Sequence, residues 1–163
     1  MRTTGIAAWL AIAVAPVVVS GQTSSTTRCD AIQYRFVNQG TPNTVPRRHS
    51  IQDGRSYALS DSIVVDGRDV AEIQVFAHAV GTDTTWDVSA RLTPAGAGSM
   101  AAATGSNRGR TLVALFGDTI LAQGVIESQL GPRVPVRLGV THLEAESLAA
   151  RVRRASGSNC RRD

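Results

Sequence analysis

The segment Trp86-Asp87-Val88-Ser89-Ala90-Arg91-Leu92-Thr93-Pro94-Ala95-Gly96-Ala97 carries the strongest structural signal in the sequence. Apolar side chains alternate with polar ones as far as Leu92, which predicts a strand with one buried face. Thr93 is a residue type that caps helices, and Pro94 suits the first position of a helix. The apolar residues that follow keep helical spacing as far as Gly105, a residue type that ends helices. The segment therefore predicts a strand that leads directly into a helix.

A similar order of elements recurs closer to the C-terminus. Residues 133–138 alternate in polarity, which predicts a strand with its apolar residues, Leu138 among them, on one side. Thr141 and Glu144 have the spacing of a helix capping box. The apolar residues beyond them repeat at helical intervals, and the segment opens with glutamates and closes with arginines, as the helix dipole favours. A second helix is therefore expected after Thr141.

The remaining sequence predicts further strands and one long loop. Alternation or continuous apolar runs predict strands at 32–37, within 57–65, and at 70–80, 111–116 and 119–122. Residues 38–54 are rich in proline, asparagine, glycine and arginine, which predicts an exposed loop. The expected class is α+β, with a mixed or antiparallel sheet and two main helices packed on one face.

The N-terminus has the pattern of a secretory signal peptide over residues 1–21. Arg2 gives the positive start, residues 5–20 are uncharged and mostly apolar, and small residues precede a cut expected before Gln22. This run is shorter than the roughly 20 residues of a membrane span, although an uncleaved N-terminal anchor remains an alternative. We therefore expect an exported protein, periplasmic or extracellular, without a stable membrane span after cleavage.

The mature chain divides by composition into a polar linker at 22–30, one domain at 31–156 and a basic tail at 157–163. Cys29 and Cys160 are its only cysteines. In an oxidising compartment an isolated pair is most simply a disulfide, and a free redox thiol is the weaker alternative. In the chain-entropy model, closing so long a loop stabilises the fold by about 4–5 kcal/mol.

Composition and charge limit the classes of function. The chain has 163 residues, 42% of them apolar, which suits one domain with one core. All 17 basic residues are arginine, and the net charge of +4 favours anionic surfaces. The excess gathers at the C-terminal end, at Arg151, Arg153, Arg154, Arg161 and Arg162. No aromatic residue lies among these arginines to stack on bases, so no nucleic-acid partner is expected.

No pattern of an enzyme or metal site stands out. His49, His78 and His142 are scattered and lack metal-ligand spacing, and neither cysteine has a neighbouring cysteine or histidine. We therefore expect no metal, no cofactor and no enzymatic activity. A small exported enzyme nevertheless remains an alternative, ranked below the two binding functions considered at the end of this subsection.

One pattern mimics a nucleotide-binding fingerprint. Gly96-x-Gly98-x-x-Ala101 follows a predicted strand, and Asp118 ends the next strand about 20 residues later. However, Pro94 and its cap place these glycines inside the first turns of the helix instead of in the preceding loop. The pattern is therefore read as part of the helix.

The segment from Trp86 to Ala97 resembles the strand-into-helix signature of the large periplasmic domain of SecD and SecDF, membrane subunits that assist protein export. In that family a hairpin follows, then a strand, a glycine, a Thr or Ser cap and a helix with Glu-Ala and Leu-Ala pairs. Gly139, Thr141 and the pairs at 144–145 and 148–149 match this order. The resemblance covers roughly residues 30–155, the head subdomain, and excludes the transmembrane part that couples transport to the proton gradient.

The resemblance implies a non-enzymatic binding module. Such a module would contact polypeptide or an envelope protein through a sheet edge or through the groove beside the helices. The second alternative is an envelope structural or small-ligand-binding domain that reuses the same fold. Each of these readings places the partner outside the cytoplasm.

Overall fold

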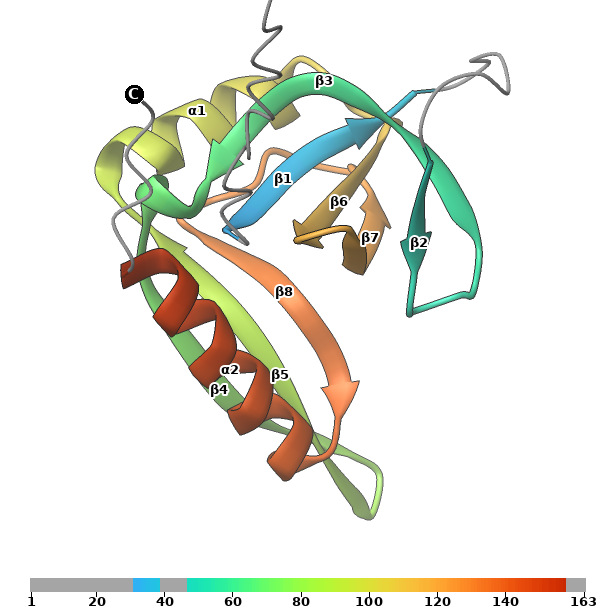
Figure 1. The fold of residues 1–163 in the computed structure, drawn as a ribbon, viewed down its shortest axis with the longest axis vertical. Helices are drawn as coiled ribbons and strands as arrows, with labels where there is room; N and C mark the ends of the chain where they lie inside the picture. Colours follow the sequence, from blue (N-terminus) through green and yellow to red (C-terminus); the bar gives the residue numbers. More distant parts are fainter. Residues whose placement is uncertain (1–30, 39–46, 158–163) are drawn as a thin grey trace, which may run out of the picture.

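The computed structural model describes residues 31–38 and 47–157. The elements of the described part are shown in Figure 1 and follow in chain order: β1 (Ile32–Val37), β2 (Arg47–Ser50), β3 (Ser56–Asp66), the 3-10 helix η1 (Gly67–Asp69), β4 (Val70–Val80), β5 (Asp83–Leu92), α1 (Pro94–Gly105), β6 (Thr111–Phe116), β7 (Thr119–Val125), β8 (Arg133–Val140) and α2 (His142–Gly157).

The strands form two separate sheets. Five strands close a barrel in the order β1-β3-β2-β7-β6, and three form an open sheet in the order β4-β5-β8. The pairing of β2 with β7 is parallel, whereas the pairs of the open sheet are antiparallel. The chain passes from the barrel to the open sheet through η1, which joins β3 to β4.

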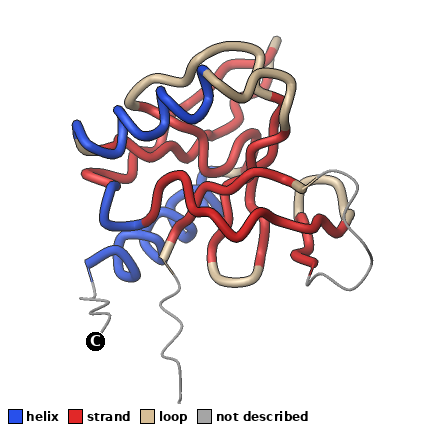
Figure 2. The backbone as a smooth tube through the Cα atoms, turned by 90° about the horizontal axis from the view of Figure 1, so that it is seen from above, coloured by secondary structure: helices blue, strands red, loops and turns tan. Residues whose placement is uncertain are grey.

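The α+β class predicted from the sequence is confirmed, with the strands divided between two sheets. Helix α2 lies along β4 and β5 of the open sheet, as Figure 1 shows, whereas α1 lies against β3, η1 and the end of β5. Seen from above, the two helices occupy separate positions around the strands (Figure 2). Both helices contact β5, the strand predicted from the Trp86 segment.

One main hydrophobic core lies between the two sheets and the helices. Val88, Ala90 and Leu92 on β5 are at most 3% exposed, which confirms the predicted buried face of this strand. Met100 of α1 and Val152 of α2 belong to the same cluster and are fully buried. A smaller cluster with Ile120 at its centre belongs to the barrel alone.

Local hydrogen bonds explain where the helices begin. The Thr93 hydroxyl accepts from the Gly96 backbone N–H at 3.2 Å, and Pro94 is the first residue of α1. The backbone N–H of Thr141 donates to the Glu144 carboxylate at 3.0 Å, and the N–H of Glu144 donates to the Thr141 hydroxyl at 3.3 Å. The bond from the Thr141 backbone N–H, followed by one that the Thr141 hydroxyl donates to the same carboxylate at 2.9 Å, holds the pKa of Glu144 below its usual range. Both predicted caps are confirmed.

The prediction of a loop across residues 38–54 is wrong for Arg47–Ser50. These residues form β2, which pairs with β3 on one side and β7 on the other and so completes the barrel. Only Ser50 of this strand is buried, so the strand needs no apolar side chains. Its sequence, Arg-Arg-His-Ser, accordingly has no alternation that would reveal it. Backbone pairing with two neighbouring strands therefore defines β2. Residues 39–46 of the same predicted loop lie outside the described residues.

Candidate functional site

Strand β8 separates two apolar grooves, and irregularities in its pairing decide which side chains reach them. Its register with β5 shifts twice, between Trp86 and Val88 and between Val88 and Ser89. The shift between Val88 and Ser89 adds a residue on β8 between Pro135 and Arg137, ahead of Leu138, and an added residue reverses the alternation of side chains beyond it. Leu138 is consequently 51% exposed, and the prediction that it shares the buried side of the strand is wrong.

The first groove, which we call the β7–β8 groove, lies between the β6–β7 hairpin of the barrel and β8 of the open sheet. It encloses about 310 Å³, and Val125 and Leu138 are its exposed apolar side chains. This volume is at the lower end of the range for ligand pockets, about 300–1,000 Å³. The groove is lined mainly by apolar residues: Tyr34, Leu112, Val113, Ala114, Ala122, Gln123, Gly124, Val125, Ile126, Glu127, Ser128, Leu130, Val134, Pro135 and Leu138.

Tyr34 fixes the two sides of this groove to each other. Its side chain extends from β1 of the barrel, and its hydroxyl donates to the Pro135 carbonyl of β8 at 3.1 Å. Burial of the side chain raises the pKa of the Tyr34 phenol far above its usual value. The phenol therefore stays neutral and keeps the proton that makes this hydrogen bond.

Gln123 brings polar groups to the barrel side of the β7–β8 groove. Its side-chain amide donates to Asp53 at 2.7 Å and to the Tyr57 hydroxyl at 3.0 Å, and the Tyr57 hydroxyl itself donates to Asp53. The bond from Tyr57, followed by those from the Arg55 backbone and Gln123, holds the pKa of Asp53 far below its usual range. This network fastens the β2–β3 turn to β7.

The second groove, which we call the α2 groove, lies between α2, β8 and the β2–β3 turn. It encloses about 430 Å³ and includes two strongly exposed apolar side chains, Ile51 at 46% and Leu143 at 81%. Arg137 lines it and donates to the Leu121 carbonyl of β7 at 3.0 Å. Arg151 also lines it, with its guanidinium 5.5 Å from the centre of the Phe116 ring.

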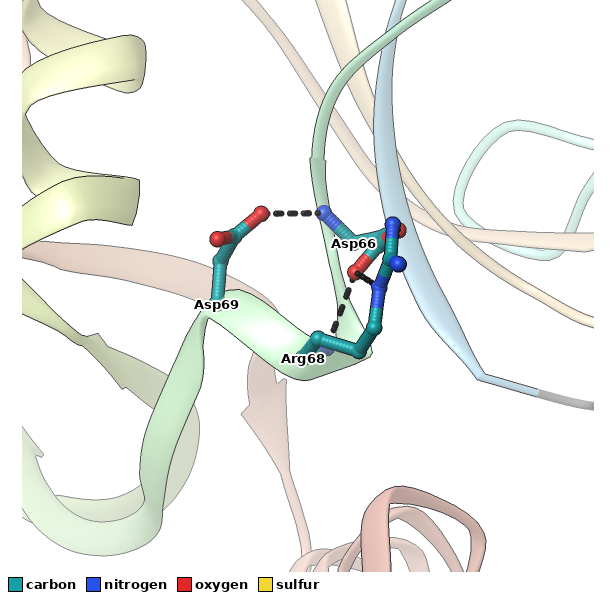
Figure 3. A network of polar contacts seen from close by, with 3 residues as sticks. All are labelled: Asp66, Arg68 and Asp69. Atoms are coloured by element: carbon teal, nitrogen blue, oxygen red, sulfur yellow. Dashed lines mark hydrogen bonds and ion pairs between the residues drawn. The ribbon is translucent and has the colours of Figure 1, made fainter. Parts of the chain in front are cut away.

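The junction between barrel and open sheet is a compact polar turn at η1 (Figure 3). The Asp66 carboxylate accepts from the Arg68 backbone N–H at 2.9 Å and pairs with its guanidinium at 2.7 Å. The Asp69 carboxylate accepts from the Asp66 backbone N–H at 3.2 Å, which completes a capping box. The Asp69 carbonyl accepts from Thr93 at 2.7 Å, so the same turn also holds the start of α1.

Close packing at this junction explains the first glycine of the fingerprint-like pattern. A side-chain carbon on Gly96 would lie 2.6 Å from the Asp69 Cβ and 2.9 Å from its carbonyl oxygen, so only glycine fits without displacement. Gly98 has open space around it. Both glycines lie within α1, as the cap at Thr93 and the proline at position 94 predicted.

The three histidines lie on three different elements. His49 is on β2, His78 on β4, and His142 begins α2, where its ring lies 4.1 Å from the Trp86 ring. Among residues 31–38 and 47–157, no three His, Cys, Asp or Glu side chains gather closely enough to hold a metal ion. The predicted signal peptide at 1–21 and both cysteines, Cys29 and Cys160, lie outside the described residues.

Sequence reasoning did not find the residues of the β7–β8 groove. Val125 follows the predicted strand 119–122, and Leu138 was assigned to a buried face. The one local signal is Gly139, whose positive φ of 66° follows Leu138 and marks irregular strand geometry. None of the helices within the described ranges combines the length and the apolar character needed to cross a bilayer.

The fold defines a two-part α+β domain, a closed barrel joined to an open sheet, with apolar grooves at their border. The family model for the SecDF P1 head subdomain matches residues 42–156, well over half of the chain. The chain therefore belongs to the SecDF P1 head subdomain family, which confirms the resemblance seen in the sequence.

Solved structures share this fold. One, described as a membrane component SecDF that enhances protein export, is 19% identical, with a TM-score of 0.60 over 79% of this chain and 63% of that chain. A structure of SecDF in a super-membrane-facing form is also 19% identical, with a TM-score of 0.58 over 78% of this chain and 19% of that chain. This chain thus spans less than two thirds of either structure. No curated protein gives a significant match.

Proposed function

We propose that this domain binds extended polypeptide in the β7–β8 groove and does so outside the cytoplasm. The observation that carries the proposal is the pair of exposed apolar side chains, Val125 and Leu138, beside a groove with apolar walls. Membership of a family found in a protein-export component supports a polypeptide ligand. The sequence pattern of residues 1–21 supports the location.

The geometry favours side-chain contacts over the addition of a strand. Strand β8 is an end strand of the open sheet, so its outer edge pairs with no described strand. Pro135 has no backbone N–H to donate, and its carbonyl already accepts from Tyr34. A ligand strand would therefore lack partners at this position. Apolar side chains projecting from an extended chain would instead bury surface against Leu138 and Val125.

A binding experiment with a matched pair of variants tests this proposal. The probe is a fluorescent peptide of alternating leucine and serine, and its anisotropy is followed as the full chain is added. Leu138→Glu should weaken binding by about tenfold or more, because it puts a charge in place of the apolar area that the peptide would bury. Leu143→Glu makes the same change in the α2 groove, at a still more exposed position, and should leave binding unchanged.

Equal losses in the two variants, or no binding by the unaltered protein, would contradict the proposal. Saturable binding of a small molecule or of one folded protein, with no binding of the peptide, would instead favour the alternative of an envelope structural or ligand-binding domain. Thermal unfolding followed by circular dichroism shows whether each variant retains the fold.

The proposed location has a separate test. If residues 1–21 are a cleaved leader, intact mass measured on the exported protein should correspond to a chain that begins at Gln22. An unchanged mass with membrane association would support the uncleaved anchor, and retention in the cytoplasm would contradict export altogether.

A further inference from the structure

Strand β4 is the end strand of the open sheet on the side away from β8, and its outer edge pairs with no described strand. Its pairing with β5 is regular from Glu72 to Val80, where Gly81 and Thr82 form the turn of the hairpin. In such a ladder successive residues direct their backbone N–H and carbonyl groups alternately toward β5 and toward the outer edge. Figure 1 shows the turn of this hairpin at the end of the molecule away from the barrel.

Two hydrogen bonds show which residues of β4 face outward. The Thr85 hydroxyl on β5 donates to the His78 carbonyl at 3.3 Å, so the backbone of His78 faces β5. The Arg153 guanidinium of α2 donates to the Ile73 carbonyl at 2.9 Å, on the opposite side of the strand. The alternation therefore directs toward the outer edge the backbone groups of Val75, Ala77 and Ala79. Among the described residues, no hydrogen bond outside the β4–β5 ladder reaches these groups.

The first half of β4 has features that prevent another strand from pairing with it. The register with β5 shifts between Val70 and Glu72, Glu72 carries a charge, and Arg153 occupies the Ile73 carbonyl. Irregular pairing and charged side chains are the usual means by which proteins protect sheet edges. The outer edge of β8 is protected as well, because Pro135 has no N–H to offer.

The second half of β4 lacks these features. Residues 74–79, Gln-Val-Phe-Ala-His-Ala, contain no aspartate, glutamate, arginine, proline or glycine. Phe76 is 36% exposed, and residues 77–79 are exposed. An uncharged segment of this kind on an unpaired edge is a template for pairing with another strand.

We propose that two copies of this chain pair antiparallel through the outer edges of β4, which joins their open sheets into one. A two-fold axis at Ala77 places this residue opposite its own copy and Val75 opposite Ala79 of the second copy. Every outward N–H and carbonyl of these residues then finds a partner. An axis placed closer to Ile73 would require the carbonyl that Arg153 already occupies.

A second copy fits this edge because it supplies the same uncharged strand. In this register Phe76 lies opposite His78 of the second copy on one face, where their rings can contact. Only small or β-branched side chains meet on the other face, and no like charges lie opposite each other. The β7–β8 groove is at the other side of the open sheet, beside β8, so the dimer does not depend on what that groove binds.

Sedimentation velocity of the full chain tests the proposal, with reductant present so that Cys29 and Cys160 cannot link two copies. From about 1 μM to 1 mM we expect a reversible change from monomer to dimer. Ala77→Pro should raise the dissociation constant by about tenfold or more, because proline removes an N–H of the interface while an edge strand tolerates it. Ala77→Thr keeps this N–H and should stay within about twofold of the unaltered protein. A monomer at every concentration, or equal effects of the two variants, would overturn the proposal.

Amide hydrogen exchange in the unaltered protein provides a test that requires no variant. The outward N–H groups of Val75, Ala77 and Ala79 should exchange rapidly when the protein is dilute and slowly when it is concentrated. The N–H groups that face β5, at Gln74, Phe76 and His78, should be protected at both concentrations. Protection of the outward groups that does not change with concentration would contradict pairing between copies.

The leucine–serine peptide separates this proposal from peptide binding in the β7–β8 groove. Adding the peptide should leave the dimer intact. If the peptide instead dissociates the dimer and protects the outward amides of β4, the edge is a polypeptide site and pairing between copies is overturned. A dimer in a protein that binds no peptide would support the edge contact and contradict only the function proposed for the groove.

Discussion

The barrel and the open sheet differ in how their strands are paired. Every barrel strand has two neighbours, whereas β4 and β8 each pair with one described strand. Closing a sheet removes its edges, so the barrel satisfies its own backbone hydrogen bonds. The open sheet instead depends on α2 to cover its inner face. The difference teaches that the barrel leaves no free strand edge, and that both apolar grooves lie at its border with the open sheet.

The distribution of exposed apolar side chains agrees with this division. Phe76 and Leu138 lie on the open sheet, and Leu143 lies on the helix that covers it. The two exposed residues on the barrel side, Ile51 and Val125, line the α2 groove and the β7–β8 groove respectively. Substitutions that compare the two parts should therefore separate stability from binding.

The largest expected effect is in the barrel core. Ile120 is fully buried in the cluster that belongs to the barrel. Ile120→Ala should lower the free energy of unfolding by about 2–4 kcal/mol, through lost burial and a residual cavity. Leu138 lies on the open sheet and its side chain is half exposed, so Leu138→Ala should change the free energy of unfolding by about 1 kcal/mol or less. Urea denaturation measures both, and comparable losses would remove the distinction between the two parts.

The next effect is at the junction of the two parts. Gly96→Ala should destabilise the protein by about 1–3 kcal/mol, because the new carbon would collide with Asp69 and force α1 away from η1. Gly98→Ala, two residues along the same helix, meets open space and should stabilise by about 0.5–1 kcal/mol through higher helix propensity. The opposite signs are the result to look for in thermal or urea unfolding, and the same sign for both would refute the packing argument.

A smaller effect is expected where the barrel is bonded to β8. Tyr34→Phe removes the donor to the Pro135 carbonyl and should cost about 1–2 kcal/mol, since a part-buried acceptor loses its partner. Tyr57→Phe removes a hydroxyl from the exposed network at Asp53 and should cost less than about 0.5 kcal/mol. Chemical denaturation compares the two, and a larger loss for Tyr57 would show that the barrel holds β8 by other contacts.

The smallest effect concerns acid stability. Hydrogen bonds, that from Tyr57 first, keep the pKa of Asp53 far below its usual range in the folded state. Its contribution to stability is therefore full above about pH 4, the range where the unfolded carboxyl is also ionised, and is lost as the pH falls further. Asp53→Asn should flatten the fall of the urea midpoint below pH 4. Because the group is exposed, the change should be small, and a steeper fall would contradict the assignment.

Much of the fold followed from local patterns. The Trp86 strand, the two capped helices and the strand at Ile32–Val37 were all predicted, because alternation and capping involve residues only a few positions apart. Strand β2 was not predicted, because its four residues carry no apolar alternation and pair with β3 and the distant β7. The division into two sheets was missed for the same reason, since strand partners are not encoded in the pattern of any one strand.

The candidate site depended on tertiary structure to a greater degree. The sequence by itself determined both helices and every strand but β2, and through its ordered motifs it determined the family, because those features are written in side-chain type and spacing. Only the folded chain decided that Leu138 is exposed and that it lines the same groove as Val125. The irregular pairing of β8 and the closure of the barrel bring these residues together, and both arise from backbone hydrogen bonds between segments far apart in the sequence.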